Sequence, residues 1–308
     1  MTSTTTPHIP AQATVPNVPT FAYDLPDGFT QVVREVNGTR IHAVVGGSGE
    51  PLALLHGWPQ TWREWRFMLR PLADLGYTVI APDLRGTGGS EVTEAGYDKD
   101  NQARDVRELL QALGLTGPVR MVGHDIGGMV AFSYARLYPD QIHKLALVDL
   151  AVPGYGLEEI MDPASGGLFH FGLFMTPEVP ELLFQGNEKA FLRWWFAKMA
   201  ANSEAFPAAE IDTIAASLSG PDALRGGFEH YRTMLRDGRD NRAWGEAGGL
   251  LTMPVLAVGG EHSVGGYLAQ ALRPVVPDVQ ESVIAGSGHY IPDEHPEALL
   301  AVLTPFLA

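Results

Sequence analysis

The stretch that decides the fold is VRMVGHDIGGMV, residues 119–130. It begins with apolar residues typical of a buried strand and runs into GGMVAFSYARLYP, which is typical of a helix. Between them stands Gly123-His124-Asp125-Ile126-Gly127. Glycines on both sides let the strand and helix backbones approach closely, so that a sharp turn presents the central side chain. A helix N-cap aspartate is the ordinary alternative, but a cap does not require both glycines.

Short apolar runs of the same kind recur, each followed by a loop and a helical stretch. They are PLALLHG, YTVIAPD, KLALVDL, PVLAVGG and QESVIAGSGH. Runs without alternation are typical of strands buried on both faces of a parallel sheet. Before them, FTQVVREVNGTRIHAVVGG alternates apolar and polar residues around Asn37-Gly38, which predicts a hairpin. We therefore expect an α/β fold with a mostly parallel, doubly wound sheet that begins with an antiparallel hairpin.

The strand–helix rhythm stops over residues 153–244, which are rich in aromatic residues and helical in pattern. An insertion between two strands of such a sheet lies over the carboxyl ends of the strands, where ligands bind. We therefore expect a helical lid over 153–244 and an α/β core made of 21–152 and 245–308. Residues 1–20 are rich in Thr and Pro, with neither a basic start nor an apolar run. They are expected to form a flexible arm rather than a secretory signal.

Composition excludes several kinds of site and partner. The 308 residues carry a formal net charge of −15, from 21 basic and 36 acidic residues, which disfavours nucleic acid and anionic membranes as partners. There is no cysteine, so disulfides, zinc-thiolate sites and thiol nucleophiles are excluded. The sequence also contains no apolar run of membrane length, no metal-binding motif and no phosphate-binding loop. We expect a cytoplasmic protein without cofactor or metal, and a homodimer is compatible with the sequence.

Four motifs, each at the end of an expected strand, give the chain a family resemblance. They are His56-Gly57-Trp58-Pro59, Asp83-Leu84-Arg85-Gly86, the turn around Asp125, and Gly288-His289. In this order they resemble the α/β-hydrolase fold, and within it the epoxide hydrolase and dehalogenase branch. The resemblance implies a lid inserted after the sixth strand and Asp125 as the nucleophile in the place of a serine. A carboxylate nucleophile attacks a saturated carbon and forms an alkyl-enzyme ester, so the substrate needs an epoxide oxygen or a halide as leaving group.

The resemblance also implies a histidine and an acid behind the nucleophile. His289 follows the last strand and is expected to be the general base that activates water. In many relatives the acid follows the seventh strand in a Gly-Glu-x-Asp pattern, but here Ser263 occupies that slot. Some members place the acid after the sixth strand, where Asp149 stands. We expect Asp149 to orient the histidine, with Glu261 as the fallback, although Asp149 could also be a turn residue.

Backbone and lid groups complete the expected site. The backbone N–H groups of Trp58 and Ile126 are expected to form the oxyanion hole. In the lid, Tyr231 begins a Tyr-Arg pair that resembles the one in epoxide hydrolases, where the tyrosine donates to the epoxide oxygen. His170 stands where a second tyrosine is usual, and a subset of epoxide hydrolases resembles this with a His/Tyr pair. Both residues could instead be buried aromatic residues of the lid.

By resemblance, the residues at three positions distinguish an epoxide hydrolase from a dehalogenase. Haloalkane dehalogenases usually have a tryptophan directly after the nucleophile, whereas haloacetate dehalogenases have arginines there and a tryptophan after the lid histidine. Here these places hold Ile126, Met129 and Phe171. The sequence therefore favours hydrolysis of a small apolar epoxide to a vicinal diol. Dehalogenation of a haloacetate or haloalkane by the same aspartate is the alternative, and a non-catalytic small-molecule receptor on this scaffold is the alternative of another class.

Overall fold

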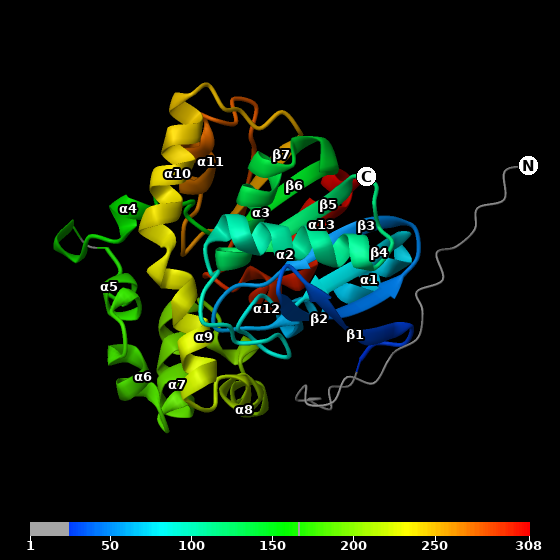
Figure 1. Ribbon diagram of the computed structural model, residues 1–308. Coiled ribbons are helices and arrows are strands. Elements are labelled where there is room, and N and C mark those ends of the chain that lie inside the picture. The colour runs from blue at the N-terminus through cyan, green and yellow to red at the C-terminus, as the bar shows by residue number, and fades with distance from the viewer. Residues whose placement is uncertain (1–24, 166) are drawn as a thin grey trace, which may run out of the picture.

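The computed structural model describes residues 25–165 and 167–308, and these contain one eight-stranded sheet with helices on both faces (Figure 1). The strands are β1 (Phe29–Val36), β2 (Thr39–Gly47), β3 (Glu50–Leu55), β4 (Tyr77–Pro82), β5 (Val119–His124), β6 (Ile142–Val148), β7 (Val255–Gly260) and β8 (Gln280–Ile284). Their order is β1-β2-β4-β3-β5-β6-β7-β8. The β1–β2 and β2–β4 pairs are antiparallel and the others parallel. The predicted fold class is confirmed, while the predicted arm, residues 1–20, lies outside the described residues.

The first two strands form the predicted hairpin. Val36 pairs with Thr39, so only two residues make the turn. Asn37 has φ 45° and Gly38 has φ 72°. Both values lie in the left-handed region that Asn and Gly adopt at low cost, and such a turn matches the twist of the strands.

Each face of the sheet carries its own apolar core. Along β2, Ala43 and Val45 pack into one buried cluster, while Val44 between them packs into the other. The first cluster is covered by α2 (Lys99–Ala112), α3 (Asp125–Leu137) and α11 (Tyr267–Leu272). The second is covered by α1 (Leu69–Asp74), α12 (Ile291–Glu294) and α13 (Pro296–Leu307). Because both faces are buried, the strands read as continuous apolar runs.

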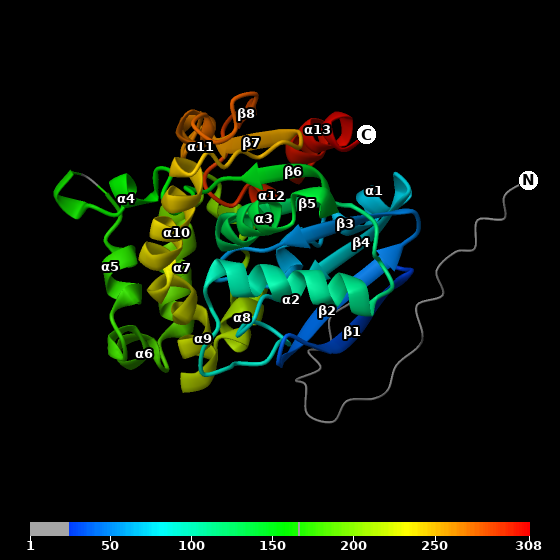
Figure 2. The ribbon, with the colours of Figure 1, turned by 45° about the horizontal axis from the view of Figure 1, so that its top comes forward.

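A run of helices separates β6 from β7 and gathers at one end of the sheet (Figures 1 and 2). The helices are α4 (Leu157–Ile160), α5 (His170–Met175), α6 (Val179–Phe184), α7 (Glu188–Met199), α8 (Ala208–Ser217), α9 (Pro221–Arg232) and α10 (Met234–Glu246). This is the helical insertion that the sequence predicts, although α10 continues past the expected bound at residue 244. Within the described residues, no helix is long and apolar enough to cross a membrane.

A buried lysine ties the lid helices to the core. Lys99, at the start of α2, is 1 % exposed. Its ammonium donates to His230 O at 2.7 Å and to Thr233 Oγ1 at 3.0 Å, and it pairs with Asp237 Oδ2 at 3.3 Å. These three acceptors lie at the junction of α9 and α10. The junction is therefore fixed to the core by a buried charge that is paired and hydrogen-bonded within the protein.

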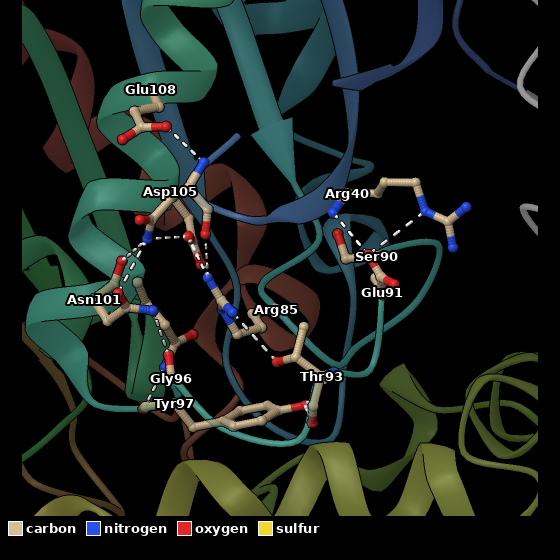
Figure 3. Close-up of polar contacts among 12 residues, drawn as sticks. Arg40, Arg85, Ser90, Glu91, Thr93, Gly96, Tyr97, Asn101, Asp105 and Glu108 are labelled. Carbon is tan, nitrogen blue, oxygen red and sulfur yellow. Dashed lines mark hydrogen bonds and ion pairs between the residues drawn. The ribbon is translucent and has the colours of Figure 1, made fainter. Parts of the chain in front are cut away.

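The motif after β4 has a structural role. Arg85 donates through Nε and Nη2 to both carboxylate oxygens of Asp105 on α2, at 2.9 and 2.6 Å (Figure 3). Asp83 accepts from the backbone N–H of Trp62 at 2.8 Å and contacts His42 Nδ1 at 2.8 Å. Bidentate and backbone hydrogen bonds of this kind fix a loop in one geometry. The loop after β4 is thereby held beside the strand ends that form the site.

Candidate active site

Asp125 stands at a strained turn between β5 and α3. Its φ is 47°, which is uncommon for a residue other than glycine. A Cβ atom on Gly123 would lie 2.5 Å from Gly127 O, and a Cβ on Gly127 would lie 2.2 Å from Leu55 O. Both glycines are therefore required for the close approach of strand and helix. Strain that the surroundings hold in place in this way is typical of functional sites.

The loop after β3 packs against this turn. Trp58 N donates to Asp125 Oδ2 at 2.9 Å. A Cβ atom on Gly57 would lie 2.6 Å from the Asp125 Cβ, so the loop leaves no space for a side chain there. Ile126 follows in the first turn of α3, where backbone N–H groups lack partners within the helix. The structure thus brings Trp58 N to Asp125, and the oxyanion role of both N–H groups stays a prediction.

His289 and Asp149 meet behind the turn. His289 Nδ1 lies 2.6 Å from Asp149 Oδ2. Asp149, which follows β6, is fully buried and also accepts from Gly260 N at 2.7 Å and from Ser263 Oγ at 2.6 Å. Three donors therefore hold this carboxylate, and its contact leaves His289 Nε2 as the nitrogen available to take a proton.

The fallback acid is not brought to the histidine. Glu261 is exposed, and its Oε2 accepts from Gly286 N at 2.8 Å. Among the described residues, no hydrogen bond or ion pair links it with His289. The hydroxyl of Ser263, in the slot that holds the acid in many relatives, instead supports Asp149. The loop after β7 thus supports the acid that follows β6.

A buried glutamate that sequence reasoning missed holds the loop around His289. The Glu294 carboxylate accepts four backbone N–H bonds, from Ala201 at 2.7 Å, Asn202 at 2.9 Å, Gly288 at 3.0 Å and Tyr290 at 2.9 Å. Two of these donors flank His289, and two follow the lid helix α7. Glu294 is 7 % exposed. Its position five residues after His289, in a polar stretch, gave no sign of burial.

A second missed glutamate lies behind the nucleophile turn. Glu64 Oε1 lies 2.6 Å from His124 Nδ1, and Glu64 Oε2 accepts from Gly57 N at 2.7 Å. Both side chains are fully buried. Burial alone would lower the pKa of His124, but the Glu64 carboxylate outweighs it and raises the pKa to about 9. His124 is therefore an imidazolium at neutral pH, and its Nε2 donates to His289 O at 2.9 Å.

A small cavity joins these strand ends to the lid. Its volume is about 60 Å³, and its wall includes Asp125 and His289 from the core together with His170 and Tyr231 from the lid. The rings of His170 and Tyr231 are 6.0 Å apart. The structure thus places the two predicted lid residues beside the predicted nucleophile. No lysine or arginine is among the described residues that line this cavity.

Burial sets the protonation of the two lid residues. Burial, assisted by the Asp125 charge, raises the pKa of Tyr231 well above its usual value, and burial lowers the pKa of His170 to about 4. At neutral pH Tyr231 therefore keeps its O–H and His170 is uncharged. Both are neutral hydrogen-bond donors on the wall opposite the core. In the described part of the chain, no cluster of His, Cys, Asp or Glu could hold a metal.

The comparison with known proteins agrees with this architecture. A family model described as alpha/beta hydrolase fold matches residues 50–296. A soluble epoxide hydrolase from Corynebacterium sp. (strain C12) is 37% identical over 281 residues, which is 89% of this chain and 95% of that protein. The chain belongs to the α/β-hydrolase-fold family, on its epoxide hydrolase branch. The family predicted from the four motifs is confirmed.

Other members of the family differ in their chemistry. The ligand-free structure of the epoxide hydrolase CorEH has a TM-score of 0.84 and 34% identity, over 91% of this chain and 98% of that one. A fluoroacetate dehalogenase from Burkholderia sp is 29% identical, over 92% of this chain and 95% of that protein. The family thus contains a dehalogenase as well as epoxide hydrolases, and the lining of the cavity bears on which leaving group this site accepts.

Proposed function

We propose that this protein hydrolyses a small apolar epoxide to a vicinal diol through an ester on Asp125. The observation that carries the proposal is the lining of the small cavity, where a carboxylate faces two neutral donors, Tyr231 and His170. An epoxide needs a hydrogen-bond donor for the departing oxygen, whereas the carboxylate of a haloacid needs a cation. The described lining has the donors and no lysine or arginine. A cytoplasmic location and a homodimer stay predictions.

In the first step, an oxygen of Asp125 attacks one epoxide carbon and the carbon–oxygen bond of the ring breaks. Trp58 N holds Oδ2, so Oδ1 is the oxygen free to attack. The electron pair of the broken bond stays on the epoxide oxygen, which takes a proton from Tyr231. Burial favours the protonated form of this tyrosine before the reaction and its reprotonation afterwards.

In the second step, water cleaves the ester. His289 takes a proton from the water through Nε2, while Asp149 holds Nδ1 and stabilises the imidazolium. The hydroxide adds to the carboxyl carbon of Asp125, and Trp58 N donates to the oxyanion, with Ile126 N as its expected partner. Collapse of this intermediate breaks the bond to the substrate oxygen, which takes the proton from the His289 imidazolium. The proton left on the Asp125 carboxyl group returns to the Tyr231 oxygen, so the diol is released and the carboxylate is restored. One oxygen of Asp125 leaves in the diol and is replaced from water.

A trapping experiment tests the proposal. His289→Gln removes the base for the second step and leaves the nucleophile intact, so styrene oxide should accumulate as an adduct. Intact mass should show one added substrate, and peptide mapping should place it on Asp125. In a single wild-type turnover in ¹⁸O-labelled water, the label should enter Asp125 and not the diol.

Two controls make the result decisive. Asp125→Asn/His289→Gln should form no adduct, because the nucleophile is gone. Chloroacetate and fluoroacetate, given to the same variants, test the dehalogenase alternative. An adduct with a haloacetate and none with any epoxide would overturn the proposal. Absence of turnover with both classes would favour a receptor.

A further inference from the structure

A second, larger cavity opens beside the first. Its volume is about 460 Å³, and its wall comes from the lid helices α4 and α7, the loop after β7, and α11. Five of the described residues line both cavities: Ile160, Leu168, Met199, Ser263 and Val264. The two spaces are therefore adjacent, and we call the boundary formed by these five residues the passage. We call the spaces the inner and outer cavity.

The two cavities differ in size, so each would hold a different part of the substrate. Sites for small-molecule ligands usually measure roughly 300–1,000 Å³. The inner cavity, at about 60 Å³, falls far below this range, whereas the outer cavity, at about 460 Å³, lies within it. We infer that the reacting ring occupies the inner cavity, which Asp125 and Tyr231 both line. A substituent longer than a few atoms has to extend through the passage.

The chemistry of the passage defines what can extend through it. Four of its five residues are apolar, and the hydroxyl of the fifth, Ser263, already donates to Asp149 at 2.6 Å. In the outer cavity, the Tyr267 hydroxyl already has a partner, since it donates to Gly156 O at 3.0 Å. The charged or polar side chains of Glu159, Lys198, His262 and Ser263 also line this cavity, and all four residues are exposed. A substituent that extends from the inner to the outer cavity would therefore contact mainly apolar side chains at the passage and exposed polar ones beyond it.

We propose that the outer cavity binds the long apolar substituent of a terminal epoxide, whose ring reacts in the inner cavity. This deepens the proposed function and rests on it. The structure assigns the loop after β7 a role in selecting substrates by chain length. Ser263 and Val264 of that loop stand between the general base and the outer cavity.

The length of the alkyl substituent on the epoxide tests the assignment of the outer cavity. Propene oxide, hexene oxide and decene oxide carry the same reacting ring, so differences in kcat/KM between them report the substituent. Each methylene that is buried should raise kcat/KM by about fourfold, until the cavity is full. Wild-type enzyme should therefore strongly prefer decene oxide over propene oxide.

A variant pair locates the effect. Val264→Phe narrows the passage, and the ratio of kcat/KM for decene oxide to that for propene oxide should fall at least tenfold. Val279→Phe is the matched control, because Val279 is also partly buried against the same core and lines neither cavity. Its ratio should equal that of the wild type. A flat chain-length profile in the wild type, or equal ratios in both variants, would overturn the proposal.

Binding without reaction separates this proposal from the proposed function. Primary amides from acetamide to decanamide present a neutral polar head of similar size and cannot be opened. Their affinity, measured by calorimetry, should rise with chain length in the wild type and lose this rise in Val264→Phe. If no epoxide is hydrolysed but this pattern holds, the cavity assignment stands and the epoxide reaction fails. Affinities that do not depend on chain length contradict the cavity assignment whatever the reaction is.

Discussion

The two halves of the candidate site are held in place by different forces. In the core half, Asp125, Asp149 and His289 each follow a strand and contact backbone N–H or charged groups at 2.6 to 2.9 Å. In the lid half, Tyr231 and His170 are held by rings, with Phe174 at 5.0 Å from Tyr231 and Trp195 at 4.9 Å from His170. Hydrogen bonds fix direction, whereas apolar packing tolerates small displacements.

This difference indicates how substitutions in the two halves should affect the reaction. Strand ends are fixed by the ladder of the sheet, so a catalytic group placed there inherits a rigid position. The lid is attached to the core by a few polar contacts, including those of Lys99 and Glu294. We therefore expect changes in the core half to abolish the reaction and changes in the lid half to adjust its rate and selectivity.

The largest effect is expected for Asp125→Asn. Asparagine adopts the left-handed backbone of residue 125 almost as readily as aspartate, so the turn should persist. Without the carboxylate, kcat for styrene oxide should fall by at least about 10⁴-fold while the melting temperature stays close to that of the wild type. Steady-state kinetics and thermal unfolding measure both. Residual activity above a few per cent would show that another group attacks.

A smaller loss is expected for Tyr231→Phe in the lid half. The change removes one donor to the departing oxygen and keeps the ring that packs on Phe174. We expect kcat to fall by about 10²- to 10³-fold, with stability unchanged. Single-turnover kinetics should show that formation of the ester, not its hydrolysis, is slowed. If ester hydrolysis slows instead, Tyr231 does not serve the epoxide oxygen.

The contact between the two halves is tested by Glu294→Gln. The amide puts a donor where the carboxylate accepts four backbone N–H groups. The free energy of unfolding should fall by about 2 kcal/mol, since hydrogen bonds to a buried charge are lost. The rate constant kcat should fall about tenfold, because the loop that carries His289 shifts. Glu297→Gln, a change of the same kind at an exposed position on α13, should alter neither quantity.

The last prediction concerns stability rather than the rate of reaction, and it depends on pH and His170. Burial lowers its pKa in the folded protein to about 4, from 6.5 in the absence of the fold. Between these values the unfolded chain binds more protons than the folded one, so this residue's contribution to stability falls as pH decreases from 6.5 to 4 and is complete above 6.5. Relative to His170→Phe, the wild type should lose up to about 3 kcal/mol of unfolding free energy across this window. Denaturant titrations at several pH values check this, and a constant difference would place His170 in contact with solvent.

The sequence by itself determined the parts of this protein that depend on local pattern. Continuous apolar runs identified the buried strands, Asn37-Gly38 identified the hairpin turn, and the glycines around Asp125 identified the turn that presents it. These signals work because backbone conformation and burial on two faces restrict the residue types that a segment accepts. The interruption of the strand pattern likewise located the helical insertion between β6 and β7.

Only the tertiary structure decided which distant groups meet. The choice between Asp149 and Glu261 depends on which carboxylate the sheet brings to His289, and no spacing along the chain contains that distance. Glu64 and Glu294 escaped notice because a buried glutamate has the same letter as an exposed one, and its partners are backbone N–H groups. The sizes of the two cavities likewise arise where lid and core meet, through side-chain packing between segments far apart in the chain.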